Sequence, residues 1–203
     1  MKTFKFNNLV FQIFNEVYEP ADDSLLLADY LKHEIRSKDI ILDLGTGCGI
    51  QAITATTLKD DVRVIATDIN PIAVKNAVKN AKLNNVNERI EFIHGDLFQP
   101  FLKKEYFNLI IFNPPYLPLP LPDQKKQDWI SLAWAQGIGS DIIQRFLLES
   151  NSYLKENGRI LLIISTLSNI DFKRWEGTYS FERLSERAFF FEKLILLKIT
   201  KVR

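Results

Sequence analysis

The chain has 203 residues, 46% of them apolar, which is enough for one sizeable core but leaves little for a second domain. Lysine and arginine number 26 against 25 for aspartate and glutamate, and this balance of +1 excludes a strong net field that would attract nucleic acid or acidic membranes. A single cysteine, Cys48, excludes an internal disulfide and a zinc site made of several cysteines.

The pattern of the N-terminal segment leads us to expect no secretory signal peptide. MKTFKFNNLVFQIFNE lacks the uninterrupted apolar core of a signal peptide, and no later run approaches the roughly 20 apolar residues that span a bilayer. We therefore expect a cytoplasmic protein with one domain, in which an N-terminal arm and helix occupy residues 1–37 and the core occupies residues 38–203.

The first segment predicts an arm followed by a helix. FKFNNLVFQIF is rich in aromatic and β-branched residues around two asparagines, which favours a short hairpin or an extended arm. In residues 21–37, apolar side chains recur at helical intervals, and Asp22, Asp23 and Ser24 are suited to the first turn.

From Asp39 onwards, short apolar runs alternate with helical windows. Strands are predicted over 39–44, 62–68, 89–96, 107–113 and 159–165, and helices over 48–58, 71–85 and 140–158, the last ending at Gly158. Such alternation implies right-handed crossovers and a largely parallel sheet with helices on both faces. Residues 179–200 indicate two more strands, so we expect a final antiparallel pair.

A glycine-rich turn follows the first strand of this core, at the edge where open α/β sheets bind their ligands. LDLGTGCG spaces Gly45, Gly47 and Gly49 as G-x-G-x-G, which permits a tight turn and the close approach of a ligand to the backbone. Ile50 stands where the dinucleotide pattern has its third glycine. Taken alone, the loop is also compatible with a purely structural strand-to-helix turn.

Three aspartates at successive strand ends favour a cofactor site. Asp68 ends the second strand, where an acidic side chain accepts hydrogen bonds from ribose hydroxyls in such folds. Asp43 could hold an ammonium group, and Asp96 could accept from an exocyclic amine. Each aspartate alone could instead cap a helix or a turn. Together they favour S-adenosylmethionine over NAD, whose pyrophosphate would require the longer glycine pattern.

The segment FNPPY follows the fourth strand, in line with those aspartates. The side-chain oxygen of Asn113 and the carbonyl of Pro114 could accept both hydrogens of one planar amino group, and the Tyr116 ring offers a face for stacking. The prolines hold both acceptors in place at a small cost in entropy. In isolation this would be a proline-rich turn, but beside the cofactor site it predicts methyl transfer to an amide or adenine nitrogen. The Leu-Pro segment 117–122 predicts an extended rim to the substrate mouth.

The sequence resembles class I methyltransferases with an NPPY motif, specifically the HemK-related branch that methylates the GGQ glutamine of class I translation release factors of the eukaryotic and archaeal type. The resemblance rests on VYEPADDSLLLAD, LDLGTGCG, TDINPIAV, FNPPY and AWAQGIGSDIIQRF, and it covers nearly the whole chain. It implies a Rossmann-like fold with a mostly parallel seven-stranded sheet and an antiparallel C-terminal strand. It also implies a cofactor site made of Ser24, Asp43, Gly45, Gly47, Asp68, Ile69, Asp96, Leu97 and Asn113, and a glutamine site made of Asn113, Pro114 and Tyr116.

The resemblance leaves several alternatives open. Eukaryotic relatives work with a small zinc-binding activator subunit that adds to a sheet edge, so such a subunit is a candidate partner beside the release factor. N6-adenine methylation of DNA or RNA would use the same planar amino group, but it asks for a recognition domain or a basic groove. Lysine methylation and a non-catalytic cofactor-binding scaffold are further alternatives. Gln136, Cys48 and the Leu-Pro segment depart from the pattern of the family.

Overall fold

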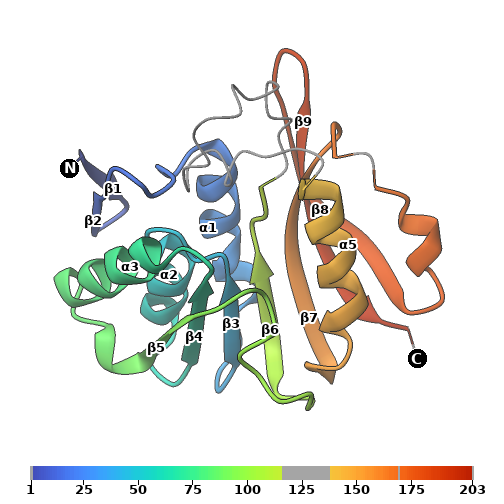
Figure 1. Ribbon diagram of the computed structural model, residues 1–203, viewed down its shortest axis with the longest axis horizontal. Helices are drawn as coiled ribbons and strands as arrows, with labels where there is room; N and C mark the ends of the chain where they lie inside the picture. Colours follow the sequence, from blue (N-terminus) through green and yellow to red (C-terminus); the bar gives the residue numbers. More distant parts are fainter. Residues whose placement is uncertain (1, 116–137, 169, 203) are drawn as a thin grey trace.

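The computed structural model describes residues 2–115, 138–168 and 170–202, and its main sheet has seven strands in the order β5-β4-β3-β6-β7-β9-β8 (Figure 1). The strands are β3 (Ile40–Leu44), β4 (Arg63–Asp68), β5 (Ile90–His94), β6 (Phe107–Phe112), β7 (Leu154–Ser165), β8 (Tyr179–Ala188) and β9 (Lys193–Lys201). The pairings among β5, β4, β3, β6 and β7 are parallel, and β9 runs antiparallel to both β7 and β8. The predicted sheet is confirmed.

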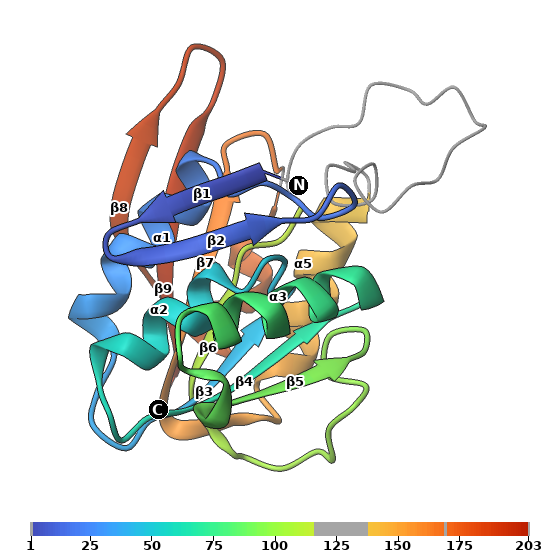
Figure 2. The ribbon, with the colours of Figure 1, turned by 90° about the vertical axis from the view of Figure 1, so that its left-hand side faces the viewer.

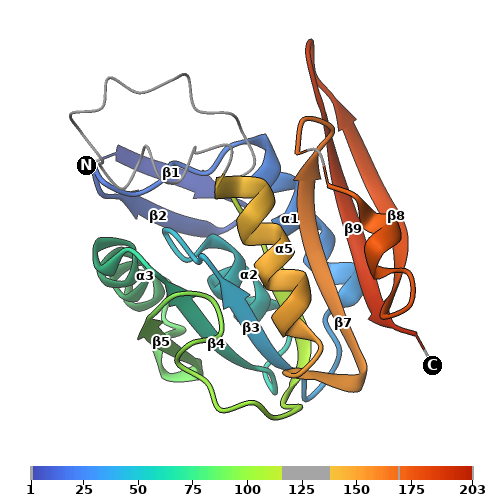
Figure 3. The ribbon, with the colours of Figure 1, turned by 45° about the vertical axis from the view of Figure 1, so that its right-hand side comes forward.

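Helices cover both faces of the sheet (Figure 3). They are α1 (Asp22–Glu34), α2 (Ile50–Leu58), α3 (Pro71–Leu83) and α5 (Ile138–Ser150), with short 3-10 helices η1 (Asn87–Arg89) and η2 (Phe172–Trp175). Successive side chains of a strand point to opposite faces. Ile41 and Ile163 accordingly pack in the cluster that includes α1 and α2, whereas Leu42 and Leu162 pack in the cluster that includes α5. Burial on both faces explains why these strands appear as continuous apolar runs.

The N-terminal arm is a β-hairpin that lies along α3 (Figure 2). Its strands are β1 (Lys2–Phe6) and β2 (Leu9–Ile13), joined through Asn7 with a φ of 52°. Three asparagines spaced four residues apart, two on α3 and one just after it, hold this arm through their side-chain oxygens. Asn84 accepts from the amide of Val10 at 3.0 Å, Asn80 from that of Gln12 at 2.8 Å, and Asn76 from that of Phe14 at 3.0 Å. Four helical residues rise about 6 Å, close to the roughly 6.7 Å of two strand residues, so the two elements stay in register.

Asn76 and Asn80 are both fully buried and both donate to the Gln12 carbonyl, at 2.6 and 3.0 Å, but Asn80 should contribute most because it also donates to the Cys48 carbonyl at 2.8 Å. Replacing Asn80 with alanine removes partners from buried backbone groups and should lower the free energy of unfolding by about 2–4 kcal/mol. Urea denaturation measures this loss. Lys82→Ala, at an exposed position of the same helix, is the control and should cost less than about 0.5 kcal/mol; equal losses in the two variants would contradict the role of Asn80.

The prediction of a helix over 140–158 that ends at Gly158 was wrong at its second half. Helix α5 ends at Ser150, and Leu154 already pairs with Phe107 as the first residue of β7. A side chain at Gly158 would place its Cβ 2.7 Å from Leu154 Cδ1, so the glycine permits the close packing of a fully buried leucine inside a strand. Tertiary burial of Leu154 therefore overrides the local helical pattern.

The predicted antiparallel pair of C-terminal strands, β8 and β9, is confirmed, with an irregularity in β8 between Arg183 and Ser185.

No helix in residues 2–115, 138–168 or 170–202 is long and apolar enough to cross a membrane.

Candidate functional site

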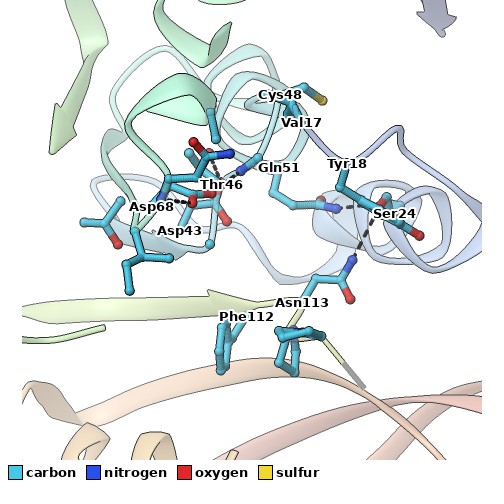
Figure 4. Close-up of a pocket in the computed structure, with 18 of the residues that line it drawn as sticks. Val17, Tyr18, Ser24, Asp43, Thr46, Cys48, Gln51, Asp68, Phe112 and Asn113 are labelled. Carbon is cyan, nitrogen blue, oxygen red and sulfur yellow. Dashed lines mark hydrogen bonds between the residues drawn. The ribbon is translucent and has the colours of Figure 1, made fainter. Parts of the chain in front are cut away.

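A cavity of about 290 Å³ opens at the carboxyl ends of β3, β4 and β6 (Figure 4). All nine residues predicted for the cofactor site line it: Ser24, Asp43, Gly45, Gly47, Asp68, Ile69, Asp96, Leu97 and Asn113. Pro114 of the predicted glutamine site lines it as well. The structure thus brings these residues together, while Tyr116, the Leu-Pro segment 117–122 and Gln136 lie outside the described residues.

The glycine-rich turn depends on left-handed backbone conformations. Gly45 and Gly47 have φ values of 64° and 57°, a region that side chains rarely allow. Gly49 has a φ of 87°, and a Cβ at this position would lie 3.1 Å from the Cβ of Ala77 on α3. The turn brings the amide of Gly47 within 2.8 Å of Asp68 Oδ2. Gly45 and Gly47 therefore allow the chain to turn, and Gly49 allows α2 to pack closely against α3.

Asp68 is a bridge between two turns. Its Oδ2 accepts from the Gly47 amide, and its Oδ1 accepts from the Asn70 amide at 2.8 Å. Burial raises the pKa of this carboxyl, while the two backbone hydrogen bonds act in the opposite direction. Because each carboxylate oxygen has a second lone pair, both oxygens can still accept from a ligand hydroxyl.

Asp43 lies at the base of the cavity and is only 1% exposed. Its Oδ2 accepts from the hydroxyl of Thr46 at 2.7 Å and from the amide of Ala52 at 3.2 Å. Burial is the largest of the influences that raise the pKa of Asp43 to about 7, and the nearby charge of Asp68 adds to it. Because burial makes the charged form of Asp43 unfavourable, a cationic ligand bound beside it would stabilise that charged form.

The raised pKa of Asp43 predicts a specific pH dependence of stability. Between about pH 4 and pH 7, the folded chain keeps a proton on Asp43 that the unfolded chain has lost, so this group lowers the free energy of unfolding as the pH rises, by at most about 1.4 kcal/mol per pH unit. Asp43→Asn keeps an acceptor oxygen but cannot ionise. Urea denaturation of the ligand-free protein should therefore show the variant gaining stability over the unsubstituted chain from pH 5 to pH 7. A difference that stays constant with pH would contradict this account.

Asp96 has a partner that the sequence did not indicate. Its Oδ2 accepts from Arg145 Nη2 of α5 at 2.8 Å, with side-chain exposures of 23% and 47%. This hydrogen bond is the largest cause of the raised pKa of Arg145. Asp96 lines the cavity, and through Arg145 it also ties the turn after β5 to α5.

Asn113 lines the cavity beside Ser24, on the side away from Asp43 and Asp68 (Figure 4). Its Nδ2 donates to Asp23 Oδ2 at 3.1 Å and to Ser24 Oγ at 3.4 Å. Gln51 Nε2 donates to the Ser24 carbonyl at 2.9 Å. The remaining amide oxygens, Asn113 Oδ1 and Gln51 Oε1, are buried and have no hydrogen-bond partner within residues 2–115, 138–168 and 170–202. A buried acceptor left unpaired is costly, so both oxygens mark places for ligand donors.

The charges around the cavity have mostly one sign. Five carboxylates line it, from Glu16, Asp23, Asp43, Asp68 and Asp96, and Arg145 is the one basic side chain among its described lining residues. This lining favours a ligand that carries positive charge and several hydrogen-bond donors, and it disfavours a pyrophosphate.

Five further residues line the cavity: the sequence suggested no role for Tyr18, Gln51, Phe112 and Arg145, and it placed Asp23 only in the first turn of a helix. Tyr18 and Asp23 lie in VYEPADDSLLLAD, one of the segments on which the family resemblance rests, and this is the signal that could have found them. Gln51 and Arg145 reach the site only through tertiary packing, so no local pattern identifies them.

Comparison with known sequences identifies a family and several relatives. The family model of the methyltransferase small domain matches residues 19–124. A protein of Methanocaldococcus jannaschii, provisionally named a protein N5-glutamine methyltransferase, is 43% identical over 75% of this chain and 74% of its own length. Human methyltransferase HEMK2 is 32% identical over 93% of this chain and 91% of its own length. The release factor glutamine methyltransferase of Aquifex aeolicus is 32% identical over 76% of this chain and 57% of its own length.

Solved structures share the fold. A ribosomal protein L11 methylase from Lactobacillus delbrueckii subsp. bulgaricus has a TM-score of 0.68 at 22% identity, covering 92% of this chain and 82% of that one. The M. jannaschii TYW2 protein in complex with AdoMet has a TM-score of 0.66 at 15% identity, covering 98% of this chain and 86% of that one. At these identities the likeness concerns the Rossmann-like architecture.

Proposed function

This chain belongs to the methyltransferase small-domain family, in its HemK-related branch, and we propose that it methylates the N5 nitrogen of the glutamine in the GGQ motif of a class I translation release factor. One observation carries the proposal beyond the names of the relatives. The Asn113 side chain lines the cavity next to Pro114, and its oxygen has no hydrogen-bond partner among the described residues, so it is an acceptor that a planar amide of the substrate could use.

The cofactor is S-adenosylmethionine, and the cavity fits it. An acidic lining, with two amide oxygens that have no partner among the described residues, suits a molecule with an ammonium group, ribose hydroxyls and an adenine amine. In the proposed assignment, Asp43 holds the ammonium group, Asp68 the ribose and Asp96 the adenine amine, with Ser24, Gly45, Gly47, Ile69 and Leu97 around them. When bound, this cofactor supplies an electrophilic methyl group on a positively charged sulfur.

The residues after β6 orient the nucleophile. The lone pair of an amide nitrogen is delocalised, so the reaction depends on holding that nitrogen in line with the methyl group, and positioning can contribute several kcal/mol. Asn113 Oδ1 and the carbonyl of Pro114 accept the two hydrogens of the glutamine amide in this assignment, and Tyr116 stacks on its plane. Acceptors aimed at the amino group also stabilise positive charge that develops on the nitrogen. The proton leaves afterwards, so no general base is required.

The most direct test is transfer of a labelled methyl group from S-adenosylmethionine to a cognate release factor. The factor with its GGQ glutamine replaced by alanine, and duplex DNA, serve as parallel substrates. We expect label on the intact factor only. Label on DNA would favour N6-adenine methylation, and label that survives replacement of the glutamine would favour another acceptor such as lysine.

We further propose that a small zinc-binding activator subunit adds to a sheet edge of this chain, as the resemblance implies. The described sheet ends at β5 on one side and at β8 on the other, and edge strands are templates for pairing with another chain. If purified chain alone gives no label on the release factor, transfer should appear when the candidate subunit is co-expressed. Activity that is unchanged by the subunit would contradict the need for it.

A further inference from the structure

We propose that Asp23 is a positioning residue that fixes the orientation of the Asn113 amide, so that its oxygen is presented to the substrate. The proposal rests on the proposed function, because it concerns the group that would hold the glutamine. It assigns a role to a buried carboxylate that neither the motif NPPY nor the cofactor accounts for.

The geometry links the start of α1 to the end of β6. Asp23 is 3% exposed, and its Oδ2 lies 3.1 Å from Asn113 Nδ2. Its Oδ1 accepts from the backbone amide of Ser24 at 2.5 Å and from the Ser24 hydroxyl at 3.1 Å. Because that hydroxyl donates to Asp23, its own lone pairs are left to accept from Asn113 Nδ2 at 3.4 Å. Both neighbours of the amide nitrogen are thus acceptors.

This arrangement makes the amide asymmetric. The two ends of an asparagine side chain have almost the same shape, so packing alone cannot distinguish them. An ionised carboxylate only accepts hydrogen bonds, and turning the amide over would set Asn113 Oδ1 against Asp23 Oδ2. Oδ1 is therefore kept turned away from Asp23, and it is buried without a hydrogen-bond partner among the described residues.

Tyr18 extends the network toward the N-terminal arm. Its hydroxyl donates to the two carboxylate oxygens of Asp23 at 3.3 and 3.4 Å. Burial, together with the charge of Asp23, raises the pKa of Tyr18, so this hydroxyl keeps its proton at neutral pH and remains a donor. Asp23 is held from one side by Tyr18 and holds Asn113 on the other.

The charge of Asp23 adds to the positional effect. A hydrogen bond from an amide N–H to a carboxylate is charge-assisted, and linked hydrogen bonds polarise one another. Donation from Asn113 Nδ2 to Asp23 increases the electron density on Asn113 Oδ1. That oxygen becomes a stronger acceptor for an amino group on which positive charge develops.

The test compares Asp23→Asn with Asp22→Asn, because Asp22 is the adjacent acid, is 49% exposed and pairs with Arg187 outside the cavity. Asp23→Asn is nearly isosteric but removes the charge and lets the Asn113 amide turn over. Its kcat for the release factor should fall by about 10–100-fold, while KM, cofactor affinity and melting temperature stay close to those of the unsubstituted chain. Asp22→Asn should leave kcat unchanged.

Two further readouts separate positioning from a structural role. In the Asn113→Ala background, Asp23→Asn should change kcat by less than about threefold, because residues that act as a unit are not additive. An undiminished fall in that background, or an unchanged kcat in the single variant, would overturn the proposal. NMR of the Asn113 side-chain amide, assigned by its loss in Asn113→Ala, should show slow hydrogen exchange that Asp23→Asn accelerates. This signal does not depend on activity, so an inactive unsubstituted chain would count against the proposed function alone, and unaltered exchange against the role of Asp23.

Discussion

Replacing Asn113 with alanine should reduce kcat for glutamine methylation by about 10²–10³-fold, the loss typical of removing one preorganised group that stabilises developing charge. The side chain lines the cavity and its oxygen has no hydrogen-bond partner in the described part of the chain, and alanine leaves only the Pro114 carbonyl to accept a hydrogen of the substrate amide. Single-turnover rates with saturating S-adenosylmethionine measure the effect on the chemical step.

The matched control is Asn87→Ala, since Asn87 contacts Glu88 at the surface and does not line the cavity. Its kcat should equal that of the unsubstituted chain. Cofactor affinity of Asn113→Ala, measured by calorimetry, should fall much less than kcat, because Asp43 and Asp68 remain in place. If cofactor affinity and kcat fell in parallel, Asn113 would be a binding residue for the cofactor and not the group that orients the substrate.

Arg159→Ala should lower the free energy of unfolding by about 3–5 kcal/mol, the cost of removing one partner from a buried ion pair. The guanidinium is 2% exposed and lies 2.5 Å from Asp39 Oδ2 and 3.5 Å from Glu34 Oε2. It also donates to the backbone carbonyls of Asn108 and Glu34. Without it, Asp39 remains buried without its ion-pair partner, and α1 loses the polar contacts of Glu34 with Arg159 of β7.

Arg183→Ala is the comparison for this prediction, because Arg183 pairs with Glu186 at a side-chain exposure of 61%. An exposed pair contributes about 0–1 kcal/mol. Urea denaturation of both variants tests the contrast. Lys198 lies 2.9 Å from Glu34 and can still balance that carboxylate, but it is not paired with Asp39, so a loss for Arg159→Ala as small as that for Arg183→Ala would contradict the prediction.

The core strands and most helices were predictable because their signals are local. Pro71 at the first position of α3 follows Asn70, whose side chain accepts from the Ile72 amide at 2.9 Å, and both residues are recognisable in the sequence. The glycines and aspartates at successive strand ends were predictable for a second reason, since parallel strands deliver their carboxyl ends to one edge.

Features that depend on distant partners were not predictable. The asparagines of α3 resemble ordinary polar positions until β2 lies against them, and Arg145 gains a role only when α5 packs beside the turn that holds Asp96. The start of β7 also depends on a distant partner, because the backbone at Leu154 is a strand that pairs with Phe107 of β6. The local helix or strand propensity of a segment is overridden where the burial of a large side chain or the pairing of a charge contributes more free energy than the propensity does.

The measurement that tests the account most directly is fragmentation mass spectrometry of a cognate release factor after incubation with this chain and S-adenosylmethionine, with Asn113→Ala and Asn87→Ala in parallel. We expect one added methyl group on the glutamine of the GGQ motif, with equal yield for Asn87→Ala and almost none for Asn113→Ala. A methyl group on another residue, or a yield that does not depend on Asn113, would contradict the assignment of this site.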